Sequence, residues 1–158
     1  MRPSQPMKPA MALARLRDLC SRAEYCTREL TEKMRRWGIS SAYIDKITAL
    51  LEEERYVDDR RYACALAHSK ASYSYWGKIK IRLFLLRKGI AGDYIDEALD
   101  AIDPDEYEQA LEKVLTAKKN QLGQEADTYE GRTKIYRHAL SKGYESAMVA
   151  AFIRERRY

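Results

Sequence analysis

The sequence has very few residues that interrupt helices. It contains 7 glycines and 4 prolines in 158 residues, and three of the prolines lie within the first nine positions. Leu, Ala, Glu, Lys and Arg dominate the remainder, and these residues favour helix. This composition predicts an all-α fold that follows a flexible tail without periodicity, residues 1–11.

Cysteines and long apolar runs are also scarce. The three cysteines form no Cys-x-x-Cys pair and are odd in number, which argues against a disulfide framework. No apolar run approaches the length of a membrane span, and residues 1–11 lack the apolar core of a signal peptide. We therefore expect a cytoplasmic protein with structural thiols and no membrane partner.

Patterns of catalytic residues are lacking as well. There is no glycine-rich phosphate loop and no Ser/His/Asp arrangement. His68 follows Cys64 by four residues, so the two could share a helix face, but no further Cys or His lies nearby to complete a metal site. His138 lies far from both. We expect a protein that is not an enzyme and that needs no metal and no cofactor.

One pattern occurs three times along the chain. A helical apolar pattern ends at Gly38, Gly89 and Gly143, which are 51 and 54 residues apart, and a second helical pattern follows each glycine. Apolar residues recur eight and four positions before each glycine and six after it: Leu30, Met34 and Ile44; Ile81, Leu85 and Ile95; Ile135, Ala139 and Val149. A helical repeat that cannot bury its own face stacks on its copies, and such arrays usually bind partners.

The helix signals fit three helices per repeat, which gives three-helix units at residues 12–55, 56–102 and 103–158. The glycines suit left-handed helix ends, and Ser40 or Ser41 can cap the helix after Gly38. Asp58 and Asp103 are natural N-caps for the first helices of the second and third units, and Pro104 suits a first helical position. Residues 120–127 are predicted to form a loop.

The middle helix of the second unit, residues 78–88, is apolar on two faces. Ile81 and Leu85 occupy the repeated core positions, whereas Ile79, Leu83 and Leu86 form a second stripe. The matching positions elsewhere are Arg28, Glu32 and Arg35 in the first unit and Thr133, Arg137 and Leu140 in the third. Packing between the two neighbouring units is the commoner explanation for such a helix; contact with a partner is the other.

The charge is unevenly distributed. The net charge is +5, and residues 60–92 contain eight basic residues and no acid, whereas residues 93–112 contain nine acids and no Lys or Arg. A basic surface suits an anionic partner. From charge alone we nominate as partner or nucleic-acid contacts Arg60, Arg61, Lys70, Lys78, Lys80, Arg82, Arg87, Lys88, Arg132, Lys134 and Arg137.

Three aromatic residues, Tyr73, Tyr75 and Trp76, directly precede the basic helix. Aromatic rings among cations can stack on the bases of single-stranded nucleic acid. The alternative is a turn between helices that is packed by its own rings, since Tyr and Trp often keep one end in water.

Several segments resemble the RecX family of bacterial regulators of the RecA recombinase. In the second repeat they are RYVDDRRYA at residues 55–63, KIKIRL at 78–83 with RKGI at 87–90, and DYIDEA at 93–98. In the first repeat they are RAEY at 22–25 with EL at 29–30 and KM at 33–34, and in the third KGY at 142–144 with AMV at 147–149. The order and spacing of these segments carry the resemblance over nearly the whole chain after the tail. One departure is Cys26, which stands where the family often has a serine able to cap the second helix above Glu29.

The resemblance implies three tandem three-helix repeats in an elongated, curved array. It implies a monomer without enzymatic activity that lodges in the groove of the RecA–DNA filament. There it would inhibit the ATPase, strand-exchange and co-protease activities of RecA, and so act in homologous recombination, DNA repair and the SOS response. Contact with single- and double-stranded DNA would be weaker or indirect. The alternative function is a basic helical DNA-binding module of the helix-turn-helix type.

Overall fold

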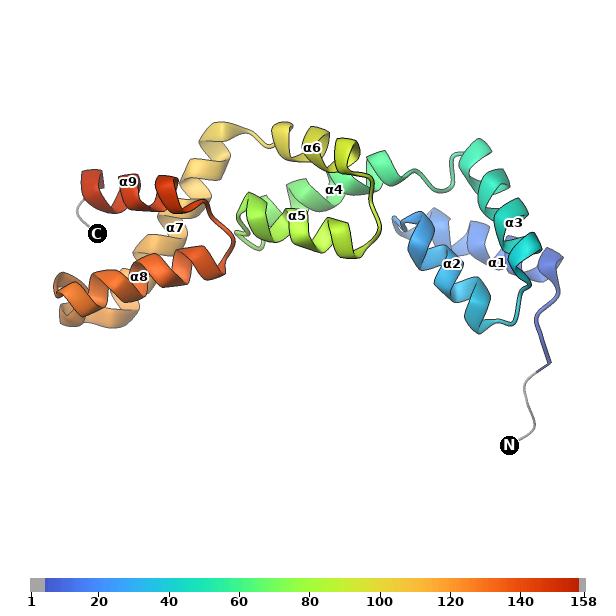
Figure 1. Cartoon of the computed structure of the whole chain (residues 1–158), viewed down its shortest axis with the longest axis horizontal. Helices are drawn as coiled ribbons and strands as arrows, with labels where there is room; N and C mark the ends of the chain where they lie inside the picture. Colours follow the sequence, from blue (N-terminus) through green and yellow to red (C-terminus); the bar gives the residue numbers. More distant parts are fainter. Residues whose placement is uncertain (1–4, 157–158) are drawn as a thin grey trace.

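The structure is a computed structural model, and it describes residues 5–156. Within that range the chain forms nine α-helices, one short 3-10 helix and no strand (Figure 1). The elements are α1 (Pro9–Arg22), α2 (Thr27–Arg36), α3 (Ser41–Glu53), α4 (Asp59–Ser72), α5 (Lys78–Arg87), α6 (Gly92–Asp100), α7 (Pro104–Leu122), η1 (Gly123–Asp127), α8 (Tyr129–Ser141) and α9 (Ser146–Arg156).

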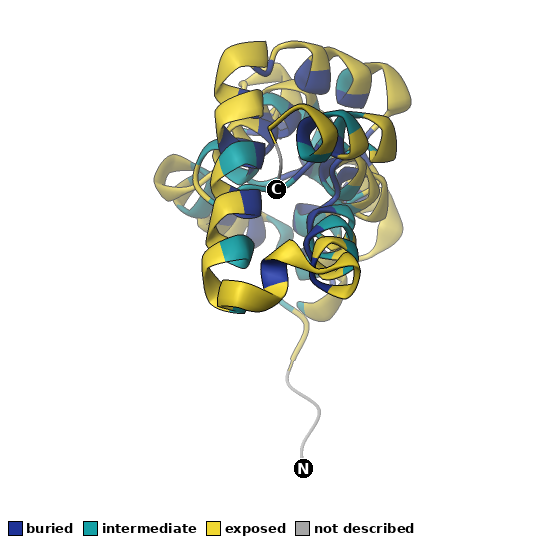
Figure 2. Ribbon diagram, turned by 90° about the vertical axis from the view of Figure 1, so that its left-hand side faces the viewer, coloured by how far each residue is buried: buried dark blue, intermediate teal, exposed yellow. Residues whose placement is uncertain are grey.

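The helices group by three in chain order and form an elongated, gently arched array (Figure 1). The units comprise α1–α3, α4–α6 and α7–α9, and their middle helices are α2, α5 and α8. The predicted all-α fold of tandem three-helix repeats is thereby confirmed. Viewed along the long axis, buried residues gather inside the array and exposed residues cover its outside (Figure 2).

The repeated apolar positions form the core. All nine residues at the matched offsets around the three glycines are buried: Leu30, Met34, Ile44, Ile81, Leu85, Ile95, Ile135, Ala139 and Val149. The register that the repeat predicts is therefore confirmed. Burial of these side chains supplies the main driving force for each unit, since a fully buried Leu or Ile contributes roughly 1.5–3 kcal/mol.

A left-handed glycine ends each middle helix. Gly38, Gly89 and Gly143 have φ angles of 77°, 75° and 96°. The amide of the residue after each glycine donates back to the carbonyl five residues earlier, as from Ile39 to Met34 (3.0 Å). This pairing satisfies a carbonyl that would otherwise be left free at the helix end. The glycines therefore turn the chain from the middle helix of each unit into its third helix.

Two of the predicted N-caps are formed as expected. The Asp58 carboxylate accepts a hydrogen bond from the amide of Arg61 (3.0 Å), and Asp103 accepts from Asp105 (2.9 Å) and Glu106 (3.0 Å). Ser40 occupies the N-cap of α3, but its side chain forms no capping bond.

Two predicted segments differ from the structure. The predicted tail extends to residue 11, but α1 already begins at Pro9, because proline is preorganised for a first helical position. Residues 1–4 of that tail lie outside the described residues. The predicted loop at 120–127 is also wrong: α7 continues to Leu122, and η1 follows it directly.

The buried side chains divide into two clusters. The first unit has a cluster of its own, to which the second unit adds only Val57 among its fully buried members. The other cluster runs without interruption through the second and third units, from Tyr62 to Phe152. Cys26 of the first unit belongs to this second cluster, although it precedes α2.

The joint between the second and third units is made largely by backbone. The amides of Gly77 and Ile79 donate to the carbonyls of Lys142 (2.8 Å) and Gly143 (3.0 Å). The Tyr144 hydroxyl donates to the carbonyl of Tyr75 (3.1 Å). A Cβ atom on Gly143 would lie only 2.3 Å from the Cβ of Lys80, so this approach depends on glycine.

The joint between the first and second units is made largely by polar side chains. The Lys88 ammonium lies 2.8 Å from Glu29, and the amide of Thr27 donates to Asp59 (2.8 Å). Arg61 pairs with Glu24 at 2.8 Å. No apolar cluster spans this joint apart from the Cys26 and Val57 contacts, within the part of the chain that the structure describes.

Candidate interaction surface

The middle helices α2, α5 and α8 follow one another along the molecule (Figure 1). The beginning of α2 meets the end of α5, where the Arg28 guanidinium donates to the carbonyl of Arg87 (2.9 Å). The beginning of α5 meets the end of α8 through the bonds of Gly77 and Ile79. We call their shared outer surface the middle-helix face: Arg28, Glu32 and Arg35 of α2, Ile79, Leu83 and Leu86 of α5, and Thr133, Arg137 and Leu140 of α8.

The centre of the middle-helix face is apolar and open to solvent. Ile79, Leu83 and Leu86 are 48%, 50% and 50% exposed. The explanation that α5 is packed on both faces between its neighbours is therefore wrong. The two neighbouring units meet α5 only near its ends, while Ile81 and Leu85 are its buried positions. A contiguous exposed apolar stripe of this kind marks an interaction site more often than an isolated exposed leucine does.

A groove of about 300 Å³ lies beside this stripe, between α5 and the end of α8. Its basic side chains are Lys80 and Arg87, and its walls are mainly apolar: Trp76, Ile79, Leu83, Phe84 and Leu140 line it with Ser141 and Gly143. A surface that combines exposed apolar groups with flanking cations suits a protein partner that bears acidic residues.

A second groove of about 490 Å³ lies between α8 and α9. Three arginines line it together with aromatic and small groups: Arg132, Arg137 and Arg154, with Tyr129, Tyr136, Ile153, Thr133 and Ala150. No acidic side chain lines it. Arg137 and Arg154 form no ion pair with any described residue, and Tyr129 is 76% exposed. Guanidinium groups among aromatic rings can bind phosphate and stack on bases.

Five of the nominated basic residues already have acidic partners inside the molecule, four of them in or beside the basic stretch. Arg60 pairs with Glu97 (2.9 Å) and Arg82 with Asp96 (2.7 Å), so the acidic α6 partly neutralises the basic stretch. Arg61 and Lys88 pair with Glu24 and Glu29 across the first joint. The hydrogen bond to Glu29 raises the pKa of the Lys88 ammonium, which stays charged as part of the joint.

Five nominees other than these four are spread over the molecule. The Lys78 ammonium lies over the ring of Tyr107 (5.1 Å) at the second joint, and Lys70 lies over Trp76 (4.7 Å). Lys134 pairs with Glu125. The remaining two line the α8–α9 groove, where Arg132 also donates to the carbonyl of Asp127 (2.7 Å). The eleven nominees therefore form no single patch, and Lys80, Arg87, Arg132 and Arg137 are those that line the two grooves.

Sequence reasoning did not nominate Tyr129, Tyr136, Ile153 and Arg154. A signal for the α8 members was present, because Tyr129, Arg132, Thr133, Tyr136, Arg137 and Leu140 follow the spacing of one helical face. The pairing of that face with α9, which brings in Arg154, depends on the turn at Gly143.

The aromatic residues at the start of α5 have different environments. Trp76 packs edge-on against Phe84, with 5.8 Å between ring centroids, and its ring carries the ammonium of Lys80 at 4.4 Å. Tyr75 packs against the core with a φ of 53°. Tyr73 is 76% exposed. The rings of this turn thus pack on neighbouring elements rather than on one another, and Tyr73 is the most exposed of the three.

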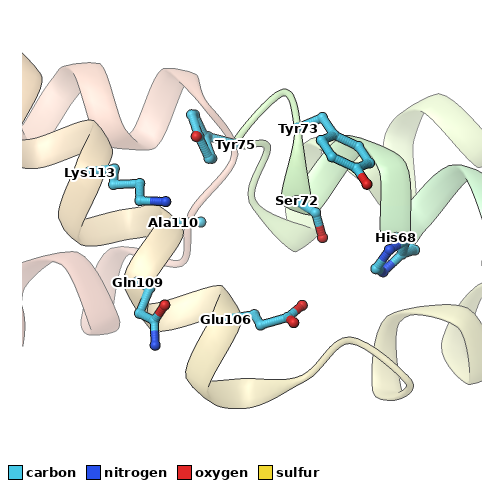
Figure 3. A pocket seen from close by; sticks show the side chains of 8 residues that line it. All are labelled: His68, Ser72, Tyr73, Tyr75, Glu106, Gln109, Ala110 and Lys113. Atoms are coloured by element: carbon cyan, nitrogen blue, oxygen red, sulfur yellow. The ribbon is translucent and has the colours of Figure 1, made fainter.

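A polar pocket lies between the end of α4 and α7 (Figure 3). His68, Ser72 and Tyr73 face Glu106 and Lys113 across it, and the His68 ring packs edge-on against Tyr73. No hydrogen bond links a potential nucleophile to a base there. No group of His, Cys, Asp and Glu residues within residues 5–156 could hold a metal ion. This pocket offers no reaction, and the absence of enzymatic activity stays a prediction.

Comparison with known proteins agrees with the resemblance seen in the sequence. A family model described as RecX, second three-helix domain, matches residues 58–99. A regulatory protein RecX from Haemophilus influenzae (strain PittEE) is 33% identical over 137 residues, which cover 86% of this chain and 88% of that protein. The chain belongs to the RecX family. Its relatives are named regulatory proteins.

Longer relatives are matched only in part. A regulatory protein RecX from Clostridium botulinum (strain Alaska E43 / Type E3) is 35% identical over 131 residues, and the chain spans 60% of its length. Among solved structures, RecX from Lactobacillus salivarius superimposes with a TM-score of 0.80 at 23% identity, covering 93% of this chain and 95% of that one. Such a likeness supports the RecX fold, including its elongated arrangement of units.

None of the helices within residues 5–156 is both long and apolar enough to span a membrane.

Proposed function

We propose that this RecX-family chain regulates the RecA recombinase by binding the RecA–DNA filament along its middle-helix face. Binding there inhibits ATP hydrolysis, strand exchange and co-protease activity. Family membership supports RecA as the partner, because the relatives carry the name regulatory protein RecX. The single observation that supports the binding surface is the exposed stripe of Ile79, Leu83 and Leu86 on the otherwise well-buried α5.

Two parts of this surface suit two components of a nucleoprotein filament. The apolar stripe, flanked by Lys80 and Arg87, suits a protein surface with acidic residues. The arginines of the α8–α9 groove suit phosphates. The grooves adjoin, because Leu140 of α8 lines the first and α8 forms a wall of the second. An elongated partner could contact both at once, which raises the overall affinity without any new contact.

The experiment is a single-stranded-DNA-dependent RecA ATPase assay with increasing amounts of the chain. We expect the wild-type chain to inhibit, and Leu83→Glu to raise the concentration needed for half inhibition at least tenfold. Met11→Glu is the matched control, because Met11 is also exposed (60%) but lies on α1, away from the middle-helix face. No inhibition by the wild-type chain would refute RecA as the partner; equal effects of the two variants would refute the surface.

The α8–α9 groove also favours the second candidate function, a helical module that binds DNA by itself. The pair Arg137→Glu and Arg154→Glu should then weaken binding to RecA-free single-stranded DNA and lower the salt slope by about two, about one for each lost phosphate contact. The pair Lys46→Glu and Lys113→Glu changes the net charge equally outside the groove. Retained RecA inhibition with lost direct DNA binding would assign the two surfaces separate roles.

A further inference from the structure

The three glycine turns share a contact that the repeat pattern alone does not require. In each turn, the backbone carbonyl of the residue before the glycine accepts a hydrogen bond from a segment that lies earlier in the chain. At Lys142 the donor is the amide of Gly77 (2.8 Å), and at Lys88 it is the thiol of Cys26 (3.7 Å). Both donors are N-cap residues of the preceding unit's middle helix. The glycine turn is thus a docking site for the start of the preceding unit's middle helix.

The first unit has no unit before it in the described chain, yet its turn is occupied. The amide of Met7 donates to the carbonyl of Trp37 (2.9 Å), the position equivalent to Lys88 and Lys142. A Cβ atom on Gly38 would lie 3.1 Å from the Cβ of Pro6. Residues 5–7, which we call the N-terminal cap, therefore stand where the start of a preceding unit's middle helix stands in the other two turns.

The opposite end of the array presents the topologically equivalent connection. The connections that dock in the two joints, residues 23–26 and 73–77, correspond in the third unit to η1 and Thr128, the N-cap of α8. The Thr128 amide and hydroxyl already donate to the carbonyl of Glu125, so the amide of Glu130, equivalent to that of Ile79, would make the docking bond there.

Within residues 5–156 this end has no glycine turn to dock on. It exposes Asp127 and Glu130, whereas Arg35 and Arg36 are exposed beside the Gly38 turn. Arg132 and Lys134 are also exposed near this end, and Lys134 pairs with Glu125, so Asp127 and Glu130 are the acidic groups that can face Arg35 and Arg36.

We propose that the Gly38 turn is a docking surface for the η1–Thr128 end of a second copy of this chain, and that the N-terminal cap competes for it. Occupied by the cap, the chain is a monomer. With the cap displaced, copies join head to tail through a heterologous contact that repeats the two internal joints. Such a contact does not close on itself and extends into open rows of copies.

The cap is the weakest of the three contacts at the glycine turns. One backbone hydrogen bond and the half-buried side chain of Met7 hold it, and Gln5 and Pro6 are exposed. The joint at Gly143 has two backbone bonds and a buried glycine. Because so few interactions hold the N-terminal cap, a larger surface can displace it. The displacement does not require α1 to unfold, since α1 begins only at Pro9.

The test measures mass against concentration by sedimentation equilibrium. Met7→Pro removes both the amide that binds Trp37 and the half-buried methionine side chain, and deletion of residues 1–7 removes the whole cap. Both should shift the mass from that of one chain, 18.4 kDa for the full length, toward multiples of the single-chain mass, with the association at least tenfold tighter than for the wild type. Met7→Leu keeps the amide and the apolar side chain and should stay monomeric. Monomers for both uncapped forms, with unchanged helical content, would overturn the proposal.

Charge variants of the deleted form identify the occupant. Arg35→Glu with Arg36→Glu should abolish association, and so should Asp127→Lys with Glu130→Lys. Mixing the two charge-reversed proteins should restore association, because one reversed end then meets the other. A synthetic peptide of residues 1–8 should return the deleted form to monomer. Association that ignores both charge pairs and the peptide would place the contact elsewhere and contradict the proposal.

Discussion

The two internal joints of the array use the same geometry but different chemistry. Between the second and third units, backbone meets backbone at Gly77 and Gly143, and one apolar cluster runs through both units. Between the first and second units, the glycine turn at Gly89 meets the flexible side chain of Arg28, and charged pairs such as Lys88–Glu29 hold the contact. Exposed and half-exposed ion pairs contribute little, typically 0–1 kcal/mol each.

Three similar units thus form two mechanical parts. We infer that α4–α9 unfold together as a two-unit block, because their shared core cannot be divided without exposing apolar side chains. The first unit, with its own cluster, can loosen from the block at smaller cost. A firm block joined to an adjustable unit suits a protein that must follow a long partner surface.

Core truncations should separate the two parts most strongly. Leu85 and Leu51 are both fully buried, one in the two-unit block and one in the first unit. Leu85→Ala and Leu51→Ala should each lower the free energy of unfolding by about 2–5 kcal/mol. In chemical denaturation followed by residue-resolved NMR, Leu85→Ala should destabilise α7–α9 as well as α4–α6. Leu51→Ala should leave the stability of α4–α9 unchanged. If each variant destabilised all three units equally, the chain would unfold as a single cooperative array.

Alanine at the two glycine turns compares the joints directly. Gly143→Ala must adopt a left-handed conformation, at about 1–2 kcal/mol, and also clashes with Lys80 backbone and Cβ, at about 1–3 kcal/mol. Gly89→Ala pays the same conformational cost, but its Cβ meets only the movable Cδ of Arg28 at 3.2 Å. We expect the first variant to lose about 1–3 kcal/mol more than the second in urea denaturation. Similar losses would mean that the second joint is as adaptable as the first.

Removing one charge should loosen only the first joint. Glu29→Gln leaves the shape unchanged but ends its ion pair with Lys88, where the two side chains are 22% and 34% exposed. The loss should be under about 1 kcal/mol and should disappear in 1 M salt, because salt screens the pair. Thermal unfolding at low and high salt measures this difference. A loss that persists undiminished at high salt would argue that the joint is held by packing instead.

Cys26→Ser should have the smallest effect. Cys26 is fully buried, its thiol donates to the carbonyl of Lys88, and its amide donates to Glu29 (3.2 Å), which is half of a capping box. Burial raises the pKa of the thiol, so it remains protonated and able to donate. A serine hydroxyl gains a better cap, about 0.5–1 kcal/mol, but loses apolar burial of similar size. Denaturation under reducing conditions should show a change in the free energy of unfolding within about 0.5 kcal/mol. A loss above about 1 kcal/mol would show that the serine hydroxyl does not stabilise the start of α2.

The fold was predictable because its signals are local. The nine matched apolar positions and the positive φ of Gly38, Gly89 and Gly143 follow from helical periodicity and from the steric freedom of glycine. The loop predicted at residues 120–127 was wrong because Asn120 and Gln121 do not favour a loop over a helix, and α7 continues to Leu122.

The candidate surface was less predictable because it depends on contacts between units. Exposure of Leu83 follows from units that meet only at the ends of α5, which no local pattern states. The partners of Arg82 and Lys88 lie on other helices, so charge counting could not show that these cations are already paired. Arg137, nominated from charge as a partner contact, lies in the α8–α9 groove, but its neighbour there, Arg154, could be found only from the fold.

Native-state hydrogen exchange tests the division into two mechanical parts most directly. Amides of the buried helices α5 and α8 should exchange through one common opening with the same free energy, the highest in the chain. Those of α2 and α3 should exchange at a lower free energy, and raising the salt to 1 M should widen this gap by weakening the charged joint alone. One common opening free energy for all nine helices, unchanged by salt, would contradict the account.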